Sequence, residues 1–350
     1  MNEKKKHPYS LIFFAVLILL TGYFIFRDSS FHEILQDILN VNIWFLLGAM
    51  CMMLFYTGCE AAVVFTLLKN LGQKTKYSRC IGYSYVDFYF SAITPSSTGG
   101  QPMQMYYMNR DGITVANSTL VVLIYIILYQ STFLLYCLAM FFLKHTFLQS
   151  VHLEKLTVLL IYGVSASGLM IGSVMVALFS KKTATAIARF LIHILAKIRL
   201  VKNEQKSTEN LEHQIDGFIE SARFLKNNRR MLLQLYAIVA LQLTAYFSIP
   251  FFVYLSFGFH GYHWSDFVAM QSMVQLSAAS LPLPGSVGAS ENAFFKLYQY
   301  VYTPDLIMPG LLLSRGVSFY FYLIVSGIAS GYVQLRASHR SRSADSLPPD

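Results

Sequence analysis

The sequence predicts an all-α protein that crosses a membrane several times. Hydrophobic residues make up 55% of the 350 residues and charged residues only 13%, and the mean hydropathy is +0.48. A soluble globular chain carries roughly 25% charged residues. The apolar residues fall into long runs and not into the alternating segments of about ten residues that are typical of a membrane β-barrel. Each long run is therefore a candidate transmembrane helix.

Six apolar runs are near or above the ~20 residues that a helix needs to cross a bilayer. They cover residues 9–26, 41–68, 115–143, 156–179, 231–259 and 306–333. The first run follows three lysines, is long for the core of a signal peptide, and has no small-residue cleavage site after it. We therefore interpret it as the first spanning helix.

Two short signatures interrupt the apolar sequence. They read TPSSTGGQP at residues 94–102 and LPLPGSVGASE at residues 281–291, and both contain Pro-x-Ser-x-Gly followed by a small residue. Proline removes a backbone donor and glycine loosens the chain. In hydrocarbon, unpaired backbone is tolerated only where it is buried in protein or lines a wet cavity. The signatures therefore mark the best candidates for a working site inside the membrane.

The basic residues set the topology, because cytoplasmic loops carry an excess of Lys and Arg. The lysine-rich N-terminus, loop 69–79, segment 181–230 and the C-terminus are basic, whereas loop 27–40 is acidic. The spans between them then require residues 80–109 to start and return inside, and residues 264–303 to start and return outside.

The sequence thus predicts about six full spans plus two oppositely oriented re-entrant or broken hairpins in an inverted repeat. Broken helices at corresponding positions of two inverted halves point to a transporter binding site. The alternative is that each hairpin is a pair of ordinary tilted short helices, which would move the signatures to a surface.

The organisation is that of a single integral membrane domain, residues 1–335, followed by a polar cytosolic tail, residues 336–350. We expect residues 338–350 of the tail to be disordered. Segment 181–230 carries eleven Lys or Arg against five Asp or Glu. Part of it is a basic amphipathic stretch, which we expect on the inner membrane face. Fifty residues are too few for a catalytic domain of ordinary size.

The signatures supply polar groups for a headgroup. The first offers hydroxyls, backbone amides and one side-chain amide, a set that can hold a phosphate. Its candidate binding residues are Ser96, Ser97, Thr98, Gly99, Gly100 and Gln101. Those of the second signature are Pro284, Gly285, Ser286 and Gly288. The alternative is that each signature is a tight turn that needs Pro and Gly for shape alone.

Ionisable residues inside the membrane are costly and are functional hypotheses by default. Counting along the helices predicts an inner cluster of Glu60, Asp87 and Arg110 and an outer cluster of Glu291, Lys296 and Arg315. A depth offset of ~13 Å argues against a direct pair between Glu60 and Arg315. The alternative for each residue is a structural ion pair that holds helices together.

Several function classes lack support. No Walker A loop, Gly-x-Ser-x-Gly elbow or His-Glu-x-x-His motif is present, so we expect no cofactor and no ATP hydrolysis. The four cysteines form no Cys-x-x-Cys pair, and we expect them to pack in the core without binding a metal. The net charge of +9 comes from the loops, so we expect membrane lipid and not nucleic acid as the partner.

The two signatures, together with Arg315 in the last run, resemble the lysylphosphatidylglycerol synthase transmembrane family, the flippase-like region of the bacterial multiple peptide resistance factor. The resemblance covers about residues 8–335. It implies a multi-pass protein of the bacterial inner membrane, with both termini cytoplasmic, that handles phosphatidylglycerol or its aminoacylated form. In the full-length family a cytosolic domain transfers lysine from charged tRNA to the lipid. The 350 residues contain no segment of that kind, so we do not expect transferase activity from them.

The leading hypothesis is a flippase-like phospholipid translocator that contributes to resistance against cationic peptides. The alternatives are lysyl transfer from lysyl-tRNA to phosphatidylglycerol, as the family name implies, or a membrane scaffold for a separate synthase. A homo-oligomer or a partner synthase is compatible with each of them.

Overall fold

A computed structural model describes residues 36–94, 97–179, 228–278 and 288–345, and these residues contain helices and no strand. The predicted span 9–26, nearly all of segment 181–230, and Ser96, Pro284, Gly285 and Ser286 lie outside the described residues. The elements are α3 (Ile43–Asn70), α4 (Tyr77–Ile93), α5 (Gly100–Arg110), α6 (Val115–Leu143), α7 (His145–Ser150), the 3₁₀ turn η2 (Leu153–Leu156), α8 (Thr157–Phe179), α11 (Arg229–Ser256), α12 (Trp264–Ala278), α13 (Ala289–Tyr298), α14 (Ile307–Arg315), the π-helical turn η4 (Gly316–Phe321) and α15 (Tyr322–Asp345).

Five described helices are long and apolar enough to cross a membrane: Ile43–Asn70, Val115–Leu143, Leu153–Val176, Arg229–Ser256 and Ile307–Ala337. They correspond to five of the six predicted spans. Three of them begin at a side chain that accepts a hydrogen bond from the first helical turn, the favoured arrangement at a helix N-terminus. These caps are Asn42, Thr114 and Asn228.

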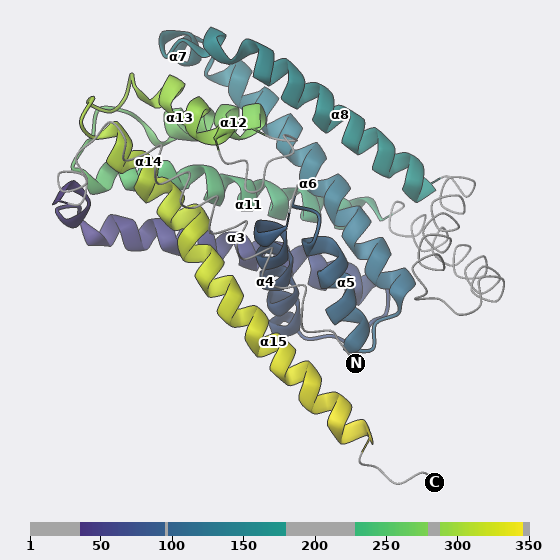
Figure 1. Cartoon of the computed structure of the whole chain (residues 1–350). Coiled ribbons are helices and arrows are strands. Elements are labelled where there is room, and N and C mark those ends of the chain that lie inside the picture. The colour runs from purple at the N-terminus through teal and green to yellow at the C-terminus, as the bar shows by residue number, and fades with distance from the viewer. Residues whose placement is uncertain (1–35, 95–96, 180–227, 279–287, 346–350) are drawn as a thin grey trace.

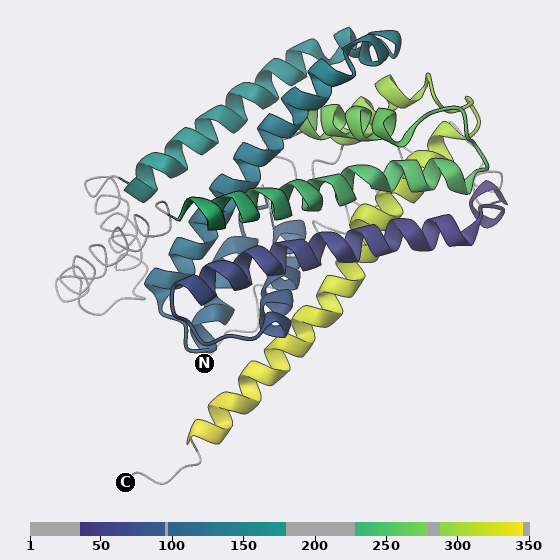
Figure 2. The same ribbon diagram turned by 180° about the vertical axis from the view of Figure 1, so that it is seen from behind.

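Two antiparallel helix pairs make up most of the bundle (Figure 1). In the first pair, the N–H of Asn42 at the start of α3 donates to the carbonyl of Ser256 at the end of α11 (2.8 Å). The second pair is α6 and α8, and α8 lies at the edge of the bundle in both views (Figure 2). Only 11% of its spanning window is buried, so α8 offers most of its surface to lipid.

Two helical hairpins have arms that are too short to span. The arms α4 and α5 contain 17 and 11 residues, and α12 and α13 contain 15 and 10. At 1.5 Å per residue the longest arm rises about 26 Å, less than the ~30 Å hydrocarbon core. The hairpins lie toward opposite ends of the long helices (Figures 1 and 2). The four short arms lie in the two signature regions.

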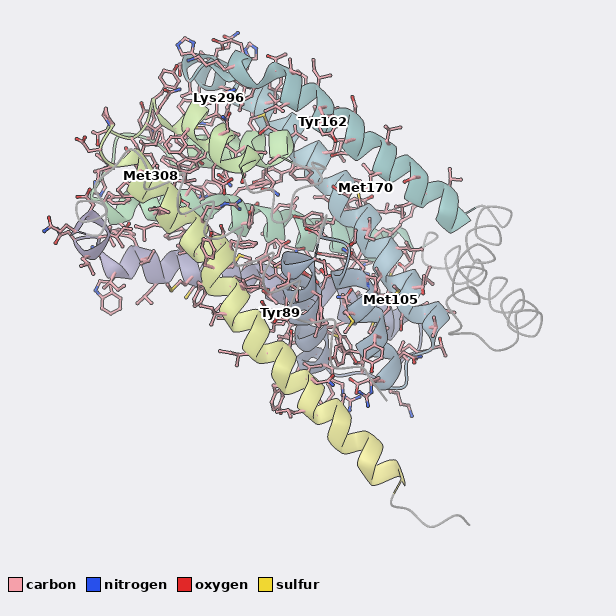
Figure 3. The ribbon with its side chains drawn as sticks, viewed as in Figure 1. Tyr89, Met105, Tyr162, Met170, Lys296 and Met308 are labelled. Carbon is pink, nitrogen blue, oxygen red and sulfur yellow. The ribbon has the colours of Figure 1, made fainter. Side chains whose placement is uncertain are left out.

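The α4–α5 hairpin packs against the last helix. Tyr89 of α4 lies beside α15 (Figure 3), where its ring comes so close to Gly327 that a Cβ there would touch it at 3.0 Å. At the other end, Lys144 after α6 donates to Asp266 in the first turn of α12 (2.9 Å). Each hairpin is thus fixed to a long helix by a specific contact.

The C-terminal segment departs from the prediction of a disordered tail. Helix α15 continues through residue 336 and ends only at Asp345. The reason is visible in the sequence, because no glycine or proline stands between Gly331 and Pro348. Polar residues end a hydrophobic span but do not by themselves end a helix.

Candidate functional site

The outer charged centre joins the start of α13 to the end of α14. Arg315 donates through Nε to Oε1 of Glu291 (2.7 Å) and through Nη2 to Oγ of Ser290 (2.7 Å). The Arg315 and Glu291 side chains are only 18% and 15% exposed. Burial reduces the screening of a charge pair, so this contact is stronger than an ion pair on a wet surface.

The second signature positions Glu291 by its backbone. Gly288 has φ +87°, a conformation that L side chains rarely adopt, and α13 begins at the next residue. Glu291 is the third residue of that helix, and its Oε2 accepts the N–H of Gly288. One carboxylate oxygen therefore caps the helix while the other meets Arg315.

Backbone irregularities surround Arg315. The π-helical turn η4 follows it directly, and the guanidinium lies over the ring of Phe319 in that turn, 5.8 Å from the centroid. On the neighbouring helix α11, Pro250 has no backbone N–H to donate. The carbonyl of Tyr246, one turn earlier, therefore lacks its usual helix donor. π-Turns are frequent at functional sites.

A small cavity with mixed polar and apolar walls lies at this centre. Its volume is about 20 Å³, and Tyr246, Pro250, Ser290 and Arg315 line it. The Oγ of Ser314 also faces it and is buried without a hydrogen-bond partner. A water molecule needs ~10–15 Å³ by this measure, so the cavity has room for one water or one ligand oxygen.

The inner charged centre lies between α3, α4 and α5. Glu60 on α3 is 4% exposed, and Nε2 of Gln104 on α5 donates to its Oε1 (3.5 Å). The hydroxyls of Ser84 and Tyr125 also face Glu60, and Tyr125 accepts a hydrogen bond from Gln242 (2.9 Å). A polar network of four helices thus surrounds one buried carboxylate.

Asp87 of α4 is the electrostatic neighbour of Glu60. Its Oδ1 is buried and has no hydrogen-bond partner. Within the described residues, no lysine or arginine forms an ion pair with either carboxylate. Buried charges are costly unless they are paired, so this centre favours a cation or protons.

The first signature builds a close contact between α4 and α5. A Cβ on Gly100 would fall far inside van der Waals contact of the Ser91 hydroxyl and the Asp87 carbonyl. The N–H of Gly99 already donates to Oγ1 of Thr94 (2.9 Å). The two glycines therefore serve helix packing, and the Gly99 amide is not open to an anion.

Two hydroxyl residues of this signature lie on the surface of the described part of the chain. Ser97 and Thr98 are exposed, and Ser97 has φ +52°. Gln101 is half-buried in the first turn of α5, but the glutamine that reaches Glu60 is Gln104, one turn further on.

Two predicted cluster members lie elsewhere. Arg110 donates to the Tyr106 hydroxyl and to the carbonyl of Ala337 on α15, both at 3.4 Å. It lies six residues, about 9 Å of helix rise, beyond Gln104. Lys296 lies on α13 (Figure 3), and no described ion pair joins it to Glu291. The outer centre is thus a pair, and the inner centre contains two acids.

The two centres are linked along the last helix. Tyr322, the first residue of α15, shares a hydrogen bond with Thr57 of α3, one turn before Glu60. Arg315 lies seven residues earlier, about 10 Å of helix rise. The centres therefore lie at different depths, as the sequence predicted.

Some residues of the two centres were missed by the sequence analysis. Ser290, Phe319, Pro250, Gln104 and Tyr125 each contribute to a centre, and none of them was a candidate. A proline inside an apolar span is a usable signal, because it always frees a carbonyl. Gln104 and Tyr125 become distinctive only once three-dimensional neighbours are known.

Comparison with known proteins agrees with this description. Residues 9–326 match the family described as the lysylphosphatidylglycerol synthase TM region. The chain belongs to this family. A UPF0104 membrane protein of Archaeoglobus fulgidus is 22% identical over 276 residues, which cover 77% of this chain and 81% of that relative. The family prediction made from the two signatures is confirmed, and both charged centres lie inside the matched region.

Proposed function

We propose that this protein translocates a phospholipid between the two leaflets of a bacterial inner membrane. The substrate class is phosphatidylglycerol or its lysyl derivative, and the consequence is resistance to cationic peptides. The observation that carries the proposal is the half-buried Glu291–Arg315 pair at one broken hairpin, with Glu60 and Asp87 at the opposite hairpin. Inverted hairpins with polar groups at two depths suit alternating access.

Each centre binds the part of the headgroup that carries the opposite charge. Arg315 is the phosphate ligand, because its planar fork can exchange the Glu291 carboxylate for a phosphodiester. Glu60 and Asp87 lack a basic partner among the described residues and receive an ammonium group. The exposed Ser97 and Thr98 hydroxyls meet the phosphate at the inner mouth.

The basic loops orient the protein with both termini in the cytoplasm. Because the sequence contains no nucleotide-binding motif, transport runs downhill or is coupled to an ion gradient. Protons suit the inner centre, where two buried carboxyls lie close together.

Transport in liposomes tests the proposal. The purified protein is reconstituted with fluorescent phosphatidylglycerol or lysyl-phosphatidylglycerol, and an impermeant quencher measures how much lipid changes leaflet. Arg315→Ala and Glu291→Ala are compared with Arg230→Ala and Glu154→Ala, which remove the same charges from exposed positions. We expect transport by the wild type and both controls and its loss in the two centre variants.

Failure of the folded wild type to move any of these lipids would contradict the proposal. The same preparation supplied with lysyl-tRNA then tests the enzymatic alternative, because a transferase would form lysyl-phosphatidylglycerol.

A further inference from the structure

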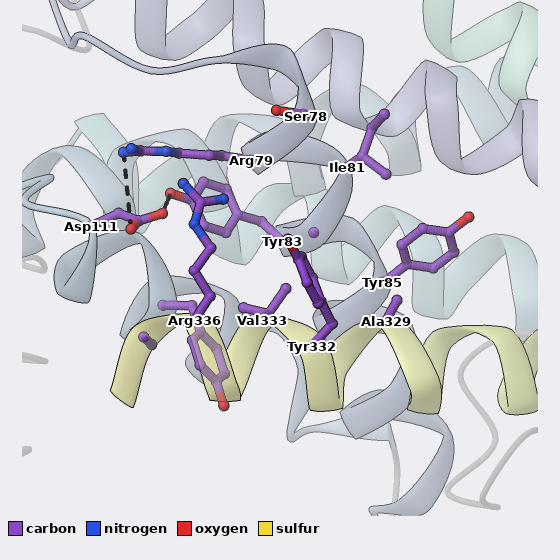
Figure 4. A pocket seen from close by; sticks show the side chains of 13 residues that line it. Ser78, Arg79, Ile81, Tyr83, Tyr85, Asp111, Ala329, Tyr332, Val333 and Arg336 are labelled. Atoms are coloured by element: carbon purple, nitrogen blue, oxygen red, sulfur yellow. Dashed lines mark hydrogen bonds and ion pairs between the residues drawn. The ribbon is translucent and has the colours of Figure 1, made fainter. Parts of the chain in front are cut away.

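A cavity of about 200 Å³ lies where α4, the end of α5 and α15 meet (Figure 4). Tyrosine rings and two arginines dominate its wall, among them Arg79, Tyr83, Tyr332 and Arg336. It shares no lining residue with either charged centre. It lies at the end of the bundle that carries the basic loop between α3 and α4.

The cavity holds more positive charge than its own acid neutralises. Asp111 accepts a hydrogen bond from the Tyr83 hydroxyl (2.6 Å), and Nη1 of Arg79 lies 3.9 Å from its other oxygen (Figure 4). The Nε of Arg79 is buried without a hydrogen-bond partner. No described residue forms a hydrogen bond or ion pair with Arg336. Two guanidinium groups therefore lie at one cavity, and some of their N–H donors have no acceptor among the described residues.

An exposed, mostly apolar stripe continues from this cavity along α15. Its exposed side chains follow helical spacing on one face, with 64–72% of each accessible: Ile324, Ile328, Tyr332 and Leu335. Tyr332 belongs both to the stripe and to the cavity wall. The charged cavity thus reaches the surface beside a track for acyl chains.

We propose that this cavity binds the phosphodiester of an anionic phospholipid from the adjacent leaflet. Arg79 and Arg336 grip the phosphate oxygens, and an acyl chain follows the α15 stripe. Guanidinium forks match phosphate geometry, and basic pockets between transmembrane helices hold anionic headgroups. The stripe favours a lipid over a soluble phosphate. The inference concerns equilibrium binding and does not rest on translocation.

Native mass spectrometry of the full chain in mild detergent tests this inference. Phosphatidylglycerol and phosphatidylcholine are titrated in competition, and the bound lipids are counted. Loss of one charge-assisted contact lowers affinity about tenfold, so Arg336→Gln should bind phosphatidylglycerol about tenfold more weakly. Arg230→Gln, at an exposed arginine outside the cavity, should bind as the wild type does. Phosphatidylcholine has the same phosphodiester beside a choline cation, so it should bind more weakly than phosphatidylglycerol to the wild type and lose less affinity in Arg336→Gln.

Arg336→Gln decides the outcome, since Arg336 has no described partner whose loss could unfold the protein. Arg79→Gln serves as a second variant, with thermal unfolding measured beside it. Equal phosphatidylglycerol binding by wild type and Arg336→Gln would overturn the inference. Complete displacement of the lipid by excess inorganic phosphate would also overturn it, because the site would then take a soluble anion. Neither result would alter the liposome test of translocation.

Discussion

Arg315 makes contacts of three kinds at once: an ion pair with Glu291, a hydrogen bond to Ser290, and a cation–π contact with Phe319. The donors lie in one plane and point in different directions. A lysine would reproduce the charge but not this geometry. At this position the shape of the guanidinium matters as much as its charge.

The Glu291–Arg315 pair should behave as a coupled unit. Arg315→Gln and Glu291→Gln each leave one partly buried charge without its partner, and we expect each to lower the free energy of unfolding by about 1–3 kcal/mol. The double variant should lose less than the sum, with a coupling energy of about 1 kcal/mol. Denaturant titration in mixed micelles measures all four proteins. Strict additivity would show that the two side chains do not interact.

Gly100 tests the close approach of α4 and α5. In Gly100→Ala the new methyl group would collide with the Asp87 carbonyl, which cannot rotate away as a side chain can. We expect a loss of about 1–3 kcal/mol in unfolding free energy, as for overpacked cores.

Gly168→Ala is the matched control for this substitution. Gly168 is an exposed helical glycine on α8, and no atom lies within 4 Å of the place that an added methyl group would take. We expect the change to be neutral or slightly stabilising, because alanine favours a helix. Equal melting of the two variants would contradict the packing role of Gly100.

At the scale of elements, length and hydropathy were sufficient to find the five described spans and the two short-armed hairpins. Helix boundaries agree within a few residues except at the end of α15, because caps such as Asn42 and Thr114 stand beside the apolar runs. The π-turn η4 was not predicted. Its residues, Gly316 to Phe321, have the composition of an ordinary helix, so the local sequence carries no signal for it.

The charged centres were predicted less completely than the helices. Depth counting paired Glu291 with Arg315 correctly and grouped Glu60 with Asp87. It also grouped Lys296 with Glu291, and no described ion pair joins them, because depth along an axis does not say which way a helix face points. The azimuth of each side chain depends on packing, which periodicity alone does not specify in helices that are apolar nearly all round.

The π-turn accommodates one extra residue between α14 and α15. Deleting Ser318 should convert η4 to regular α-helix and leave Arg315 at nearly the same rotation relative to α15. We expect a folded protein that keeps the Glu291 contact and lipid transport. Deleting Ile324 instead removes a residue from regular helix, rotates Arg315 by about 100° relative to the rest of α15, and should abolish transport. Equal transport by the two deletion variants would show that the rotation of Arg315 does not matter for function.

At the scale of the whole molecule, the two hairpins lie toward opposite ends of the bundle, and each brings its own charged centre. Their chemistry differs, because the outer centre contains both signs of charge and the inner centre contains two acids. A headgroup that carries a phosphate and an ammonium would thus meet a different partner at each depth. Such a route requires the two hairpins to open to opposite sides of the membrane.

Cysteine labelling in intact cells tests that requirement. In a background without the four native cysteines, Lys74→Cys reports the loop before α4 and Glu154→Cys reports the turn before α8, and both positions are exposed. Because basic loops stay in the cytoplasm, we expect an impermeant maleimide to label Glu154→Cys at once and Lys74→Cys only after the membrane is permeabilised. Labelling of both from one side would mean that the hairpins share an aqueous face. Alternating access between two inverted halves would then be ruled out, whatever the liposome assay showed.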